Sequence, residues 1–310
     1  MTTDNKLVRR WRDNSRLGIN HHLLFPASFD SADVHLATLP VPLGMEVFSI
    51  VDCMIPDARH EEQAVALIRA SGKEAIYNCP LMTGPGLNPH GADESARARA
   101  EAEVRRHIDR AKRLGSRRMV VASGADPGPS LRAKETERFV SYMQRLCAYA
   151  GPELTLMIEP FDRSIGKNLL IGPTREAVSV VEEVRAAGFA NVGILMDMGH
   201  VPLMEETFRH AVATAGSLIR HVHLGSCVKR DPADPLYGDM HPPWGYPGGE
   251  NDVAETVEFL RCLGESGYFD GAEPASLTLE MRPYPGASEP DSVAAMLRKL
   301  DEAWEALARG

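Results

Sequence analysis

Short apolar runs alternate with amphipathic segments along almost the whole chain. The runs are rich in leucine and β-branched residues and do not alternate cleanly with polar residues, which is typical of strands covered on both faces. Eight strands are predicted, at residues 17–25, 45–51, 74–79, 117–122, 154–159, 192–197, 219–224 and 276–281. Between them, helical periodicity predicts helices over about residues 59–71, 93–114, 131–150, 174–188, 203–216, 252–266 and 288–308. The clearest helix has Asp93 as a candidate N-cap and Gly115 as a candidate C-cap.

Eight strands, each followed by a helix, favour an α/β protein with a single (β/α)8 TIM barrel. That fold typically needs about 250 residues, and the chain has 310. A doubly wound open sheet is the main alternative, but no GxGxxG motif or P-loop follows the first strand. No Gly/Ser-rich linker or internal repeat interrupts the pattern, so we expect one domain over residues 1–310. A long insertion at about 226–251 separates the seventh strand from its helix, and loops of this length are usually functional.

Composition narrows the classes of function. The chain is 44% hydrophobic and 25% charged, which is ordinary for a globular protein. A net charge of −9 and a pI of about 5.7 argue against a nucleic-acid-binding surface. No signal-peptide pattern and no apolar run of about 18 residues is present, so we expect no membrane association. The five cysteines show no CxxC spacing and indicate reduced thiols, which predicts a cytoplasmic protein.

Four successive predicted strands present metal-capable side chains at the same end. The carboxyl ends of the strands face the active site in a TIM barrel. The residues found there are Glu159 on the fifth strand, Asp197 on the sixth, His221 and His223 on the seventh, and Glu280 on the eighth. Alternation places both histidines on one face of the strand, and one of them can equally be a core residue. Because clustered carboxylates repel and raise one another's pKa values, the set predicts a bound divalent metal ion.

The donor set also indicates which ion would bind. Three carboxylates and one imidazole favour hard to borderline metals, so we expect Mn²⁺, with Mg²⁺, Co²⁺ and Zn²⁺ as alternatives. Four protein ligands leave an octahedral ion with open positions for water or substrate oxygens. This is typical of a Lewis-acid site rather than of a closed structural site.

The motifs IEP, DxGH, HVH and LE at these strand ends resemble the xylose-isomerase-like barrel superfamily of sugar isomerases and epimerases. The resemblance extends from the first predicted strand to the last. It implies that the metal ligands are Glu159, Asp197, His223 and Glu280. It also implies that Glu159 and Glu280 are catalytic and exchange the substrate proton, and that His200 contacts a substrate oxygen.

Further substrate-binding candidates are His22, Lys229, Arg230 and Arg282. The epimerases of this superfamily have an arginine six residues after the ligating histidine; this chain has Lys229 there, followed by Arg230. Alternation along the first strand sends His21 or His22 toward the barrel mouth, and we favour His22. Arg282 follows Glu280 closely. His241, within the insertion, could cap the pocket, but a loop imidazole is usually solvated, so His241 is interpreted as lying outside the site.

The chemistry that fits these residues is removal of a proton next to a carbonyl. A metal-dependent isomerase or epimerase would act on a keto-sugar in this way, through an enediolate stabilised by the ion. A carboxylate on the fifth or eighth strand would act as base, and the opposite one would return the proton. The expected partner is therefore a small-molecule sugar or glycoside.

The same enolate chemistry supports a second interpretation, a lyase that expels a leaving group β to the carbonyl of a 3-oxo-glycoside. Catalytic subunits of C-glycoside deglycosidases, in the same superfamily, are proposed to act in this way. Three aromatic residues of the insertion, Tyr237, Trp244 and Tyr246, favour this interpretation because they could hold a flat aglycone. It would require a partner subunit, and the helix at 289–309 would suit a small partner subunit or a homo-oligomer.

Two other classes fit the sequence less well. Apurinic endonuclease-like barrels need additional His and Glu ligands on strands two to four and a basic face. Here the third and fourth strands end in YNCP and VASG, and the chain is acidic. A non-catalytic sugar-binding barrel has no need of a base on each side of its ligand.

Overall fold

Eight parallel strands close into a barrel in the computed structural model of the chain, which describes residues 3–309. Each strand pairs with the next along the chain, and β1 also pairs with β8. The strands are β1 (Ser15–Asn20), β2 (Ile50–Cys53), β3 (Glu74–Asn78), β4 (Arg118–Val121), β5 (Thr155–Ile158), β6 (Val192–Asp197), β7 (Ile219–Leu224) and β8 (Ala275–Leu279). The predicted TIM barrel is therefore confirmed, and the open-sheet alternative is wrong.

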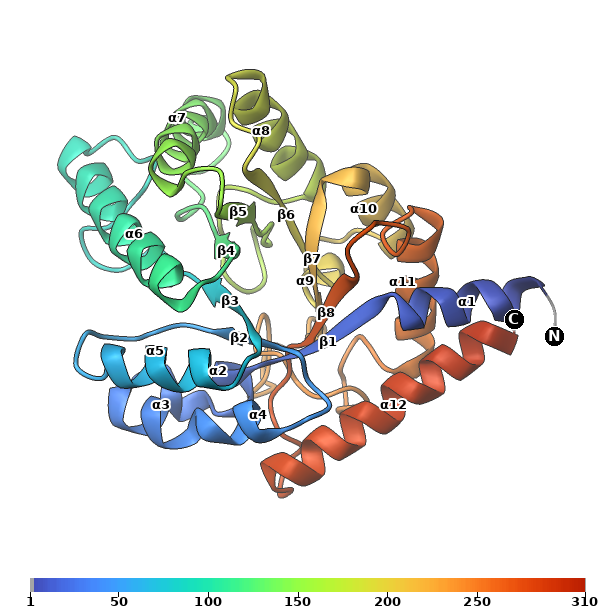
Figure 1. The fold of residues 1–310 in the computed structure, drawn as a ribbon. Helices are drawn as coiled ribbons and strands as arrows, with labels where there is room; N and C mark the ends of the chain where they lie inside the picture. The colour runs from blue at the N-terminus through green and yellow to red at the C-terminus, as the bar shows by residue number, and fades with distance from the viewer. Residues whose placement is uncertain (1–2, 310) are drawn as a thin grey trace.

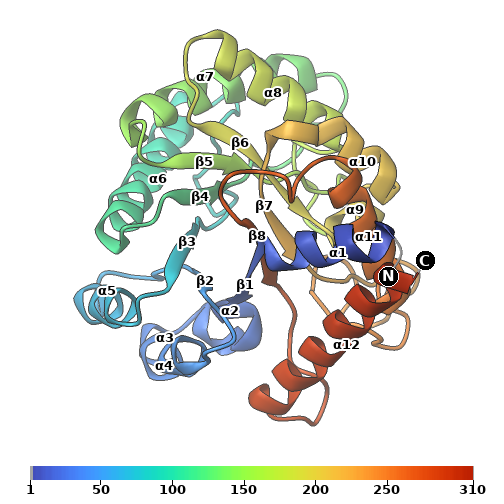
Figure 2. The same ribbon diagram turned by 45° about the vertical axis from the view of Figure 1, so that its right-hand side comes forward.

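Helices surround the barrel on its outside (Figures 1 and 2). The longer ones are α1 (Thr3–Asp13), α5 (Glu61–Ala70), α6 (Glu94–Leu114), α7 (Arg132–Ala150), α8 (Thr174–Ala186), α10 (Phe208–Ala215), α11 (Val253–Glu265) and α12 (Glu289–Arg309). The shorter ones are α2 (His21–Leu24), α3 (Ala32–Thr38), α4 (Pro40–Gly44) and α9 (His200–Leu203). Helix α12 packs against both α1 and α11, so the last helix joins the first (Figure 1). Among the described residues, no helix combines the length and apolarity needed to cross a membrane.

The barrel interior is filled by apolar side chains rather than open as a pore. Five consecutive strands contribute one buried side chain each to a separate inner cluster, namely Ile50, Ile76, Val120, Met157 and Leu195. Their sequence neighbours on the same strands belong instead to the large cluster between barrel and helices. This alternation is what a closed sheet with two buried faces requires. The packed apolar side chains inside the barrel support the carboxyl ends of the strands.

Several predicted boundaries agree closely with the structure. The predicted strands at 192–197 and 219–224 coincide with β6 and β7. Helix α6 is capped as expected: the Asp93 carboxylate accepts from the N–H of Ser95, and Gly115 takes a left-handed backbone with a φ of 78°. These elements have strong local signals, an apolar run of strand length or a helix with both caps.

The predicted strand at 17–25 is wrong beyond residue 20. The side-chain oxygen of Asn20 accepts from the N–H groups of His22 and Leu23, at 3.0 and 3.2 Å. This N-cap ends β1 and begins α2, so both His21 and His22 lie on a helical turn rather than on a strand.

The predicted strand at 45–51 overlaps β2 only at its last two residues. The Lys73 ammonium donates to the carbonyl oxygens of Met45 and Phe48 and holds this apolar stretch as a loop. Strand β2 consequently starts later and includes Asp52. The predicted helix at 203–216 is wrong before residue 208, where α10 begins, because α9 ends at residue 203. The short helices α2, α3, α4 and α9 and the N-terminal α1 were not predicted.

His107 on α6 predicts a pH dependence of stability. It is buried beside the Tyr77 hydroxyl (2.7 Å), and burial, with Arg110 and Arg106 adding to it, lowers the pKa of His107 to about 3. Between the ordinary histidine pKa and this value, the unfolded chain binds a proton that the folded chain does not, so stability falls as pH falls. From pH 7 to pH 5 this histidine should account for about 2 kcal/mol of the lost free energy of unfolding.

Urea unfolding at the two pH values checks this expectation. The loss of stability between pH 7 and pH 5 should be smaller in His107→Gln than in the unmodified chain. His210→Gln, at an exposed histidine, should lose as much stability as the unmodified chain. Equal losses in all three proteins would contradict the prediction.

Candidate active site

Four metal-capable side chains converge at the carboxyl end of the barrel. Glu159 and Glu280 directly follow β5 and β8, Asp197 ends β6, and His223 lies within β7. One ligand atom from each lies within 4.8 Å of the others, and all four residues are buried. The structure thus brings together the four residues that the sequence predicted as a set.

Three buried atoms of this cluster, His223 Nδ1, Asp197 Oδ2 and Glu280 Oε2, have no hydrogen-bond partner outside the cluster and face one another. His223 Nδ1 lies 2.5 Å from Glu280 Oε2. The other oxygen of Asp197 accepts from the N–H of Gly199 (2.5 Å), and the other oxygen of Glu280 accepts from the side-chain amide of Asn20 (2.7 Å). One oxygen of each carboxylate is therefore fixed by the protein while its second oxygen faces the cluster. Buried polar atoms without partners are costly, so the donor set fits a cation.

The carboxylates of the cluster cannot all ionise easily in the absence of a cation. Burial, reinforced by Glu280, raises the pKa of Glu159 to about 8 and that of Asp197 to about 6. Burial also opposes ionisation of Glu280, but the facing His223 and His241 outweigh it and lower the pKa of Glu280 to about 2. A divalent ion would favour the ionised form of every carboxylate in the cluster.

Asp52, which the sequence did not reveal, fixes the ring of His223. The Nε2–H of His223 donates to Asp52 Oδ2 (3.0 Å), and His221 Nε2 lies 3.1 Å from the same oxygen. Thr278 donates to the other oxygen, Oδ1, at 2.6 Å. Because its Nε2 carries the hydrogen toward Asp52, His223 directs the lone pair of Nδ1 into the cluster, as a metal ligand must.

Gly18 makes room for this network. A Cβ at this position would lie 2.4 Å from the Thr278 hydroxyl oxygen and 2.9 Å from Ile50 Cβ. Only glycine fits there without displacing the hydroxyl that donates to Asp52.

His200 lies in the cavity wall, as the sequence predicted, and is held at both ring nitrogens. Its Nε2 is 2.9 Å from Asp239 Oδ1 and its Nδ1 is 3.2 Å from the carbonyl oxygen of Pro160. Burial alone would lower the pKa of His200, but Asp197 and Asp239 outweigh burial and raise it well above its ordinary value.

The long insertion folds over the site and contributes three lining residues, Asp239, Met240 and His241. Asp239 and His241 are buried and line the cavity, with His241 Nε2 2.7 Å from Asp239 Oδ1 and its unpartnered Nδ1 3.8 Å from Glu280 Oε2. The interpretation of His241 as a solvated loop residue is therefore wrong. Its backbone has a φ of 51°, a conformation held in part because its carbonyl oxygen accepts from the N–H of Arg282 (2.8 Å).

The aromatic residues of the insertion do not line the cavity, contrary to the idea that they hold an aglycone. Trp244 is fully buried and donates from its indole N–H to the Gly225 carbonyl oxygen (3.2 Å). The Tyr246 hydroxyl binds Asp234 instead. These contacts, like that of the Asn251 amide with the carbonyl of Met198 (3.1 Å), stabilise the insertion itself.

The other predicted substrate-binding residues divide into two groups. His22 and Arg282 line the cavity; His22 lies 2.8 Å from the Ser28 hydroxyl, and Arg282 donates to the Met240 carbonyl (2.7 Å). Lys229 and Arg230 are not among the cavity-lining residues. The Lys229 ammonium donates to the Pro202 carbonyl (3.1 Å), and the exposed Arg230 pairs with Glu250.

The cavity lining combines polar and apolar side chains. Besides the cluster, its polar lining includes Asn20, Asn78 and Lys167, and the Lys167 ammonium is 3.4 Å from Asp239 Oδ2. Lys167 thus lines the cavity, whereas Lys229 does not. The apolar lining includes Leu23, Phe29, Met54, Leu81, Phe161 and Met240.

Comparisons with known proteins agree with this architecture. D-psicose 3-epimerase from Agrobacterium fabrum is 25% identical over 210 residues, which cover 65% of this chain and 68% of that protein. The solved 3-keto-D-glucoside 4-epimerase from E. coli superposes with a TM-score of 0.65 at 15% identity, covering 92% of this chain and 99% of that one. The IOLI protein, solved with a bound zinc atom, gives a TM-score of 0.66 at 14% identity, covering 94% of this chain and 98% of that one. A family model, described as a xylose isomerase-like TIM barrel, matches residues 42–302. The chain therefore belongs to the xylose isomerase-like TIM barrel family, as the motifs at its strand ends predicted.

Proposed function

We propose that the protein is a divalent-metal-dependent isomerase or epimerase of keto-sugars, which moves the proton next to the substrate carbonyl through an enediolate. The observation that carries this proposal is the buried cluster of two glutamates, an aspartate and a histidine at the mouth of the barrel, whose inward-facing atoms have no partner outside the cluster. The D-psicose 3-epimerase relative supports the same class of reaction.

Glu159, Asp197, His223 and Glu280 would hold the ion. Three carboxylates and one imidazole suit Mn²⁺ best, with Mg²⁺, Co²⁺ and Zn²⁺ as alternatives. When bound, the ion would supply Lewis-acid polarisation of the substrate carbonyl.

Glu159 is the better placed of the two glutamates to take a proton from the substrate. It lines the cavity, its side chain is 11% exposed, and none of the described hydrogen bonds involves its carboxylate. Glu280 is held by Asn20 and would return the proton from its own side of the site. The two carboxylates would exchange these roles in the reverse reaction.

The cavity walls supply groups that would orient substrate oxygens. His22, His200 and Arg282 line the cavity and would be the contacts for substrate oxygens. We assign to Lys167 the contact expected of Lys229 and Arg230, because Lys167 lines the cavity beside Asp239.

A lyase acting on 3-oxo-glycosides is the second candidate function. The apolar residues of the cavity lining favour it, because they would suit an apolar aglycone. Among them Phe29, 43% exposed, would contact the aglycone. The 3-keto-D-glucoside 4-epimerase neighbour is named for a substrate of this kind.

Product analysis separates the two functions. Mn²⁺-loaded protein would be incubated with a panel of free ketoses and, in parallel, with 3-oxo-glycosides. A new ketose epimer supports the epimerase, and release of aglycone supports the lyase. Glu280→Gln serves as the control for both reactions, and no conversion of either class of compound would contradict the proposal.

Asp52 should control metal affinity from behind His223. The Asp52 carboxylate accepts a hydrogen bond from the Nε2–H of His223, and Asp52→Asn removes the negative charge of this acceptor. The substitution should weaken metal binding by about 10- to 100-fold. Competition with a chromophoric chelator measures the affinity, and Asp57→Asn, at a partly exposed position beyond the end of β2, is the matched control. Unchanged affinity in Asp52→Asn would show that the ring of His223 does not need this partner.

A further inference from the structure

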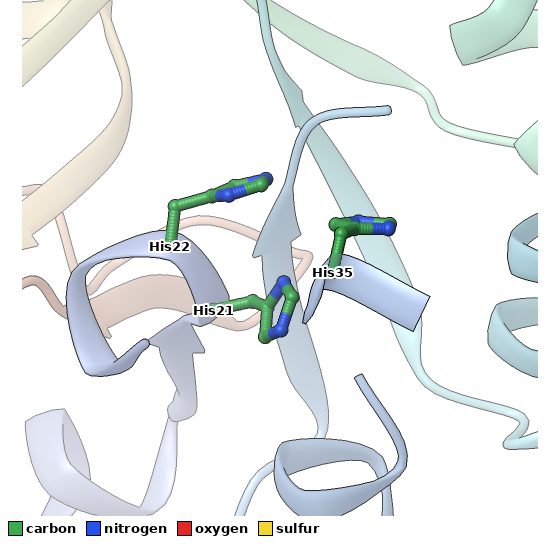
Figure 3. Close-up of side chains that lie close together, drawn as sticks. All are labelled: His21, His22 and His35. Carbon is green, nitrogen blue, oxygen red and sulfur yellow. The ribbon is translucent and has the colours of Figure 1, made fainter. Parts of the chain in front are cut away.

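Three histidines outside the proposed metal cluster gather beside the catalytic cavity. His21 and His22 begin α2, and His35 lies on α3. All three are buried, and one ring nitrogen from each lies within 4.8 Å of the others. Figure 3 shows the three side chains close together, with His21 between the other two and below them.

The tautomer of His21 leaves a lone pair without a partner. The Thr38 hydroxyl donates to the Val34 carbonyl (2.8 Å), so it must accept from the Nε2–H of His21 (2.9 Å). The other nitrogen, Nδ1, therefore carries a lone pair, and this atom is buried without a hydrogen-bond partner. Such orphaned buried atoms are rare in folded proteins and call for an explanation.

His22 and His35 add one ring nitrogen each. His22 Nδ1–H donates to Ser28 (2.8 Å), and its Nε2 lone pair accepts from the N–H of Met54 (3.1 Å), so an ion bound at Nε2 would take the place of this N–H. His35 also has a buried nitrogen, Nε2, without a partner. The ring of His21 is edge-on to that of His35, with an interplanar angle of 72° and centroids 5.0 Å apart.

The three rings are neutral at physiological pH. Burial lowers the pKa of His22 to about 3 and that of His35 to about 4, and it holds the pKa of His21 well below its ordinary value. Neutral imidazole is the form that binds metal ions. None of the described hydrogen bonds or ion pairs of these rings involves a carboxylate.

We propose that His21, His22 and His35 form a second metal site, which takes a borderline first-row ion of the Zn²⁺ type. Three imidazoles without a carboxylate suit Zn²⁺ rather than Mn²⁺ or Mg²⁺, so the two sites differ in selectivity. The Met54 carbonyl oxygen, 3.1 Å from His22 Nε2, offers an oxygen as a fourth ligand. Because His22 also lines the catalytic cavity, the ion would join α2 and α3 to the end of β2 in the cavity wall. The proposal does not depend on the proposed function.

Zinc stoichiometry tests the second site with matched variants. Chelator-treated protein would be loaded with Zn²⁺, desalted and analysed for zinc per folded chain, with folding checked by circular dichroism. The unmodified chain and His210→Gln, at an exposed histidine, should hold two ions. The double variant His21→Gln/His35→Gln should hold one ion, at the carboxylate cluster. The double variant Asp197→Asn/Glu280→Gln should also hold one ion, at the three histidines. A folded His21→Gln/His35→Gln variant that still holds two ions would overturn the proposal.

Anomalous diffraction at the zinc edge provides a test that needs no variant. Crystals of the unmodified chain soaked in Zn²⁺ should show one peak at the carboxylate cluster and one between the three histidine rings. A peak at the carboxylate cluster alone would overturn the second site and leave the first intact. The two peaks therefore report separately on the carboxylate cluster and on the histidine site.

Discussion

Replacing either Glu159 or Glu280 with glutamine is expected to lower turnover by at least about 10³-fold. Each glutamate belongs to the buried cluster at the barrel mouth, and each is assigned one side of the proton transfer. Glutamine keeps the size of the side chain but can neither take the proton nor carry the charge that attracts a cation. The loss should therefore appear in kcat, and metal affinity should fall in parallel.

Steady-state kinetics with the converted sugar measure this loss. Glu137→Gln, at an exposed glutamate on α7, makes the same chemical change away from the site and should retain full activity. Circular dichroism would verify that each variant is folded. Activity within about tenfold of the unmodified protein in Glu159→Gln or Glu280→Gln would contradict the assigned roles.

Removing the divalent ion is expected to abolish turnover while leaving the barrel folded. The fold rests on an apolar interior and on helices packed around the strands, so it does not depend on the ion. The carboxylate cluster, by contrast, depends on the ion. The ion would supply both the Lewis acid and the positive charge that balances the carboxylates.

Dialysis against a chelator, followed by metal analysis, activity assay and circular dichroism, tests this expectation. Activity should return on addition of Mn²⁺, and more slowly or less completely on addition of Mg²⁺, whose preference for retaining water ligands is stronger. Full activity in protein shown to contain less than about one-tenth of an ion per chain would contradict a metal-dependent mechanism.

The residues at the strand ends were predictable because strand position alone determines where they point. Asp197 and His223 lie on β6 and β7, whose limits the apolar pattern predicted correctly. Once the barrel is inferred, the carboxyl ends of parallel strands must meet at one face. Non-local information was not needed to place these side chains near one another.

Asp52 was missed because an apolar run is not always a strand. The stretch before β2 is held as a loop by Lys73, a contact between residues about 25 apart that no local pattern reveals. The misplaced strand ended one residue before Asp52, so the carboxylate behind His223 stayed outside the predicted site. The better indication would have been the apolar pair Ile50–Val51 leading directly into an acidic residue.

The loop residues could not be placed from sequence because their positions depend on contacts between distant segments. His241 is fixed through Asp239, which lies against His200, 39 residues away along the chain, and through the backbone of Arg282. The same insertion turns Lys229 toward Pro202 and away from the cavity. Residue type and spacing carry no information on such pairings.

Turnover in D₂O tests the central claim, metal-dependent proton exchange at the carbon next to a carbonyl, most directly. The Mn²⁺-loaded protein would convert the sugar or glycoside found in the product screen, and mass spectrometry with NMR would locate any deuterium. The account predicts deuterium at the carbon next to the carbonyl, dependent on the ion and absent in Glu159→Gln. Complete conversion with the original hydrogen retained at that carbon would contradict it.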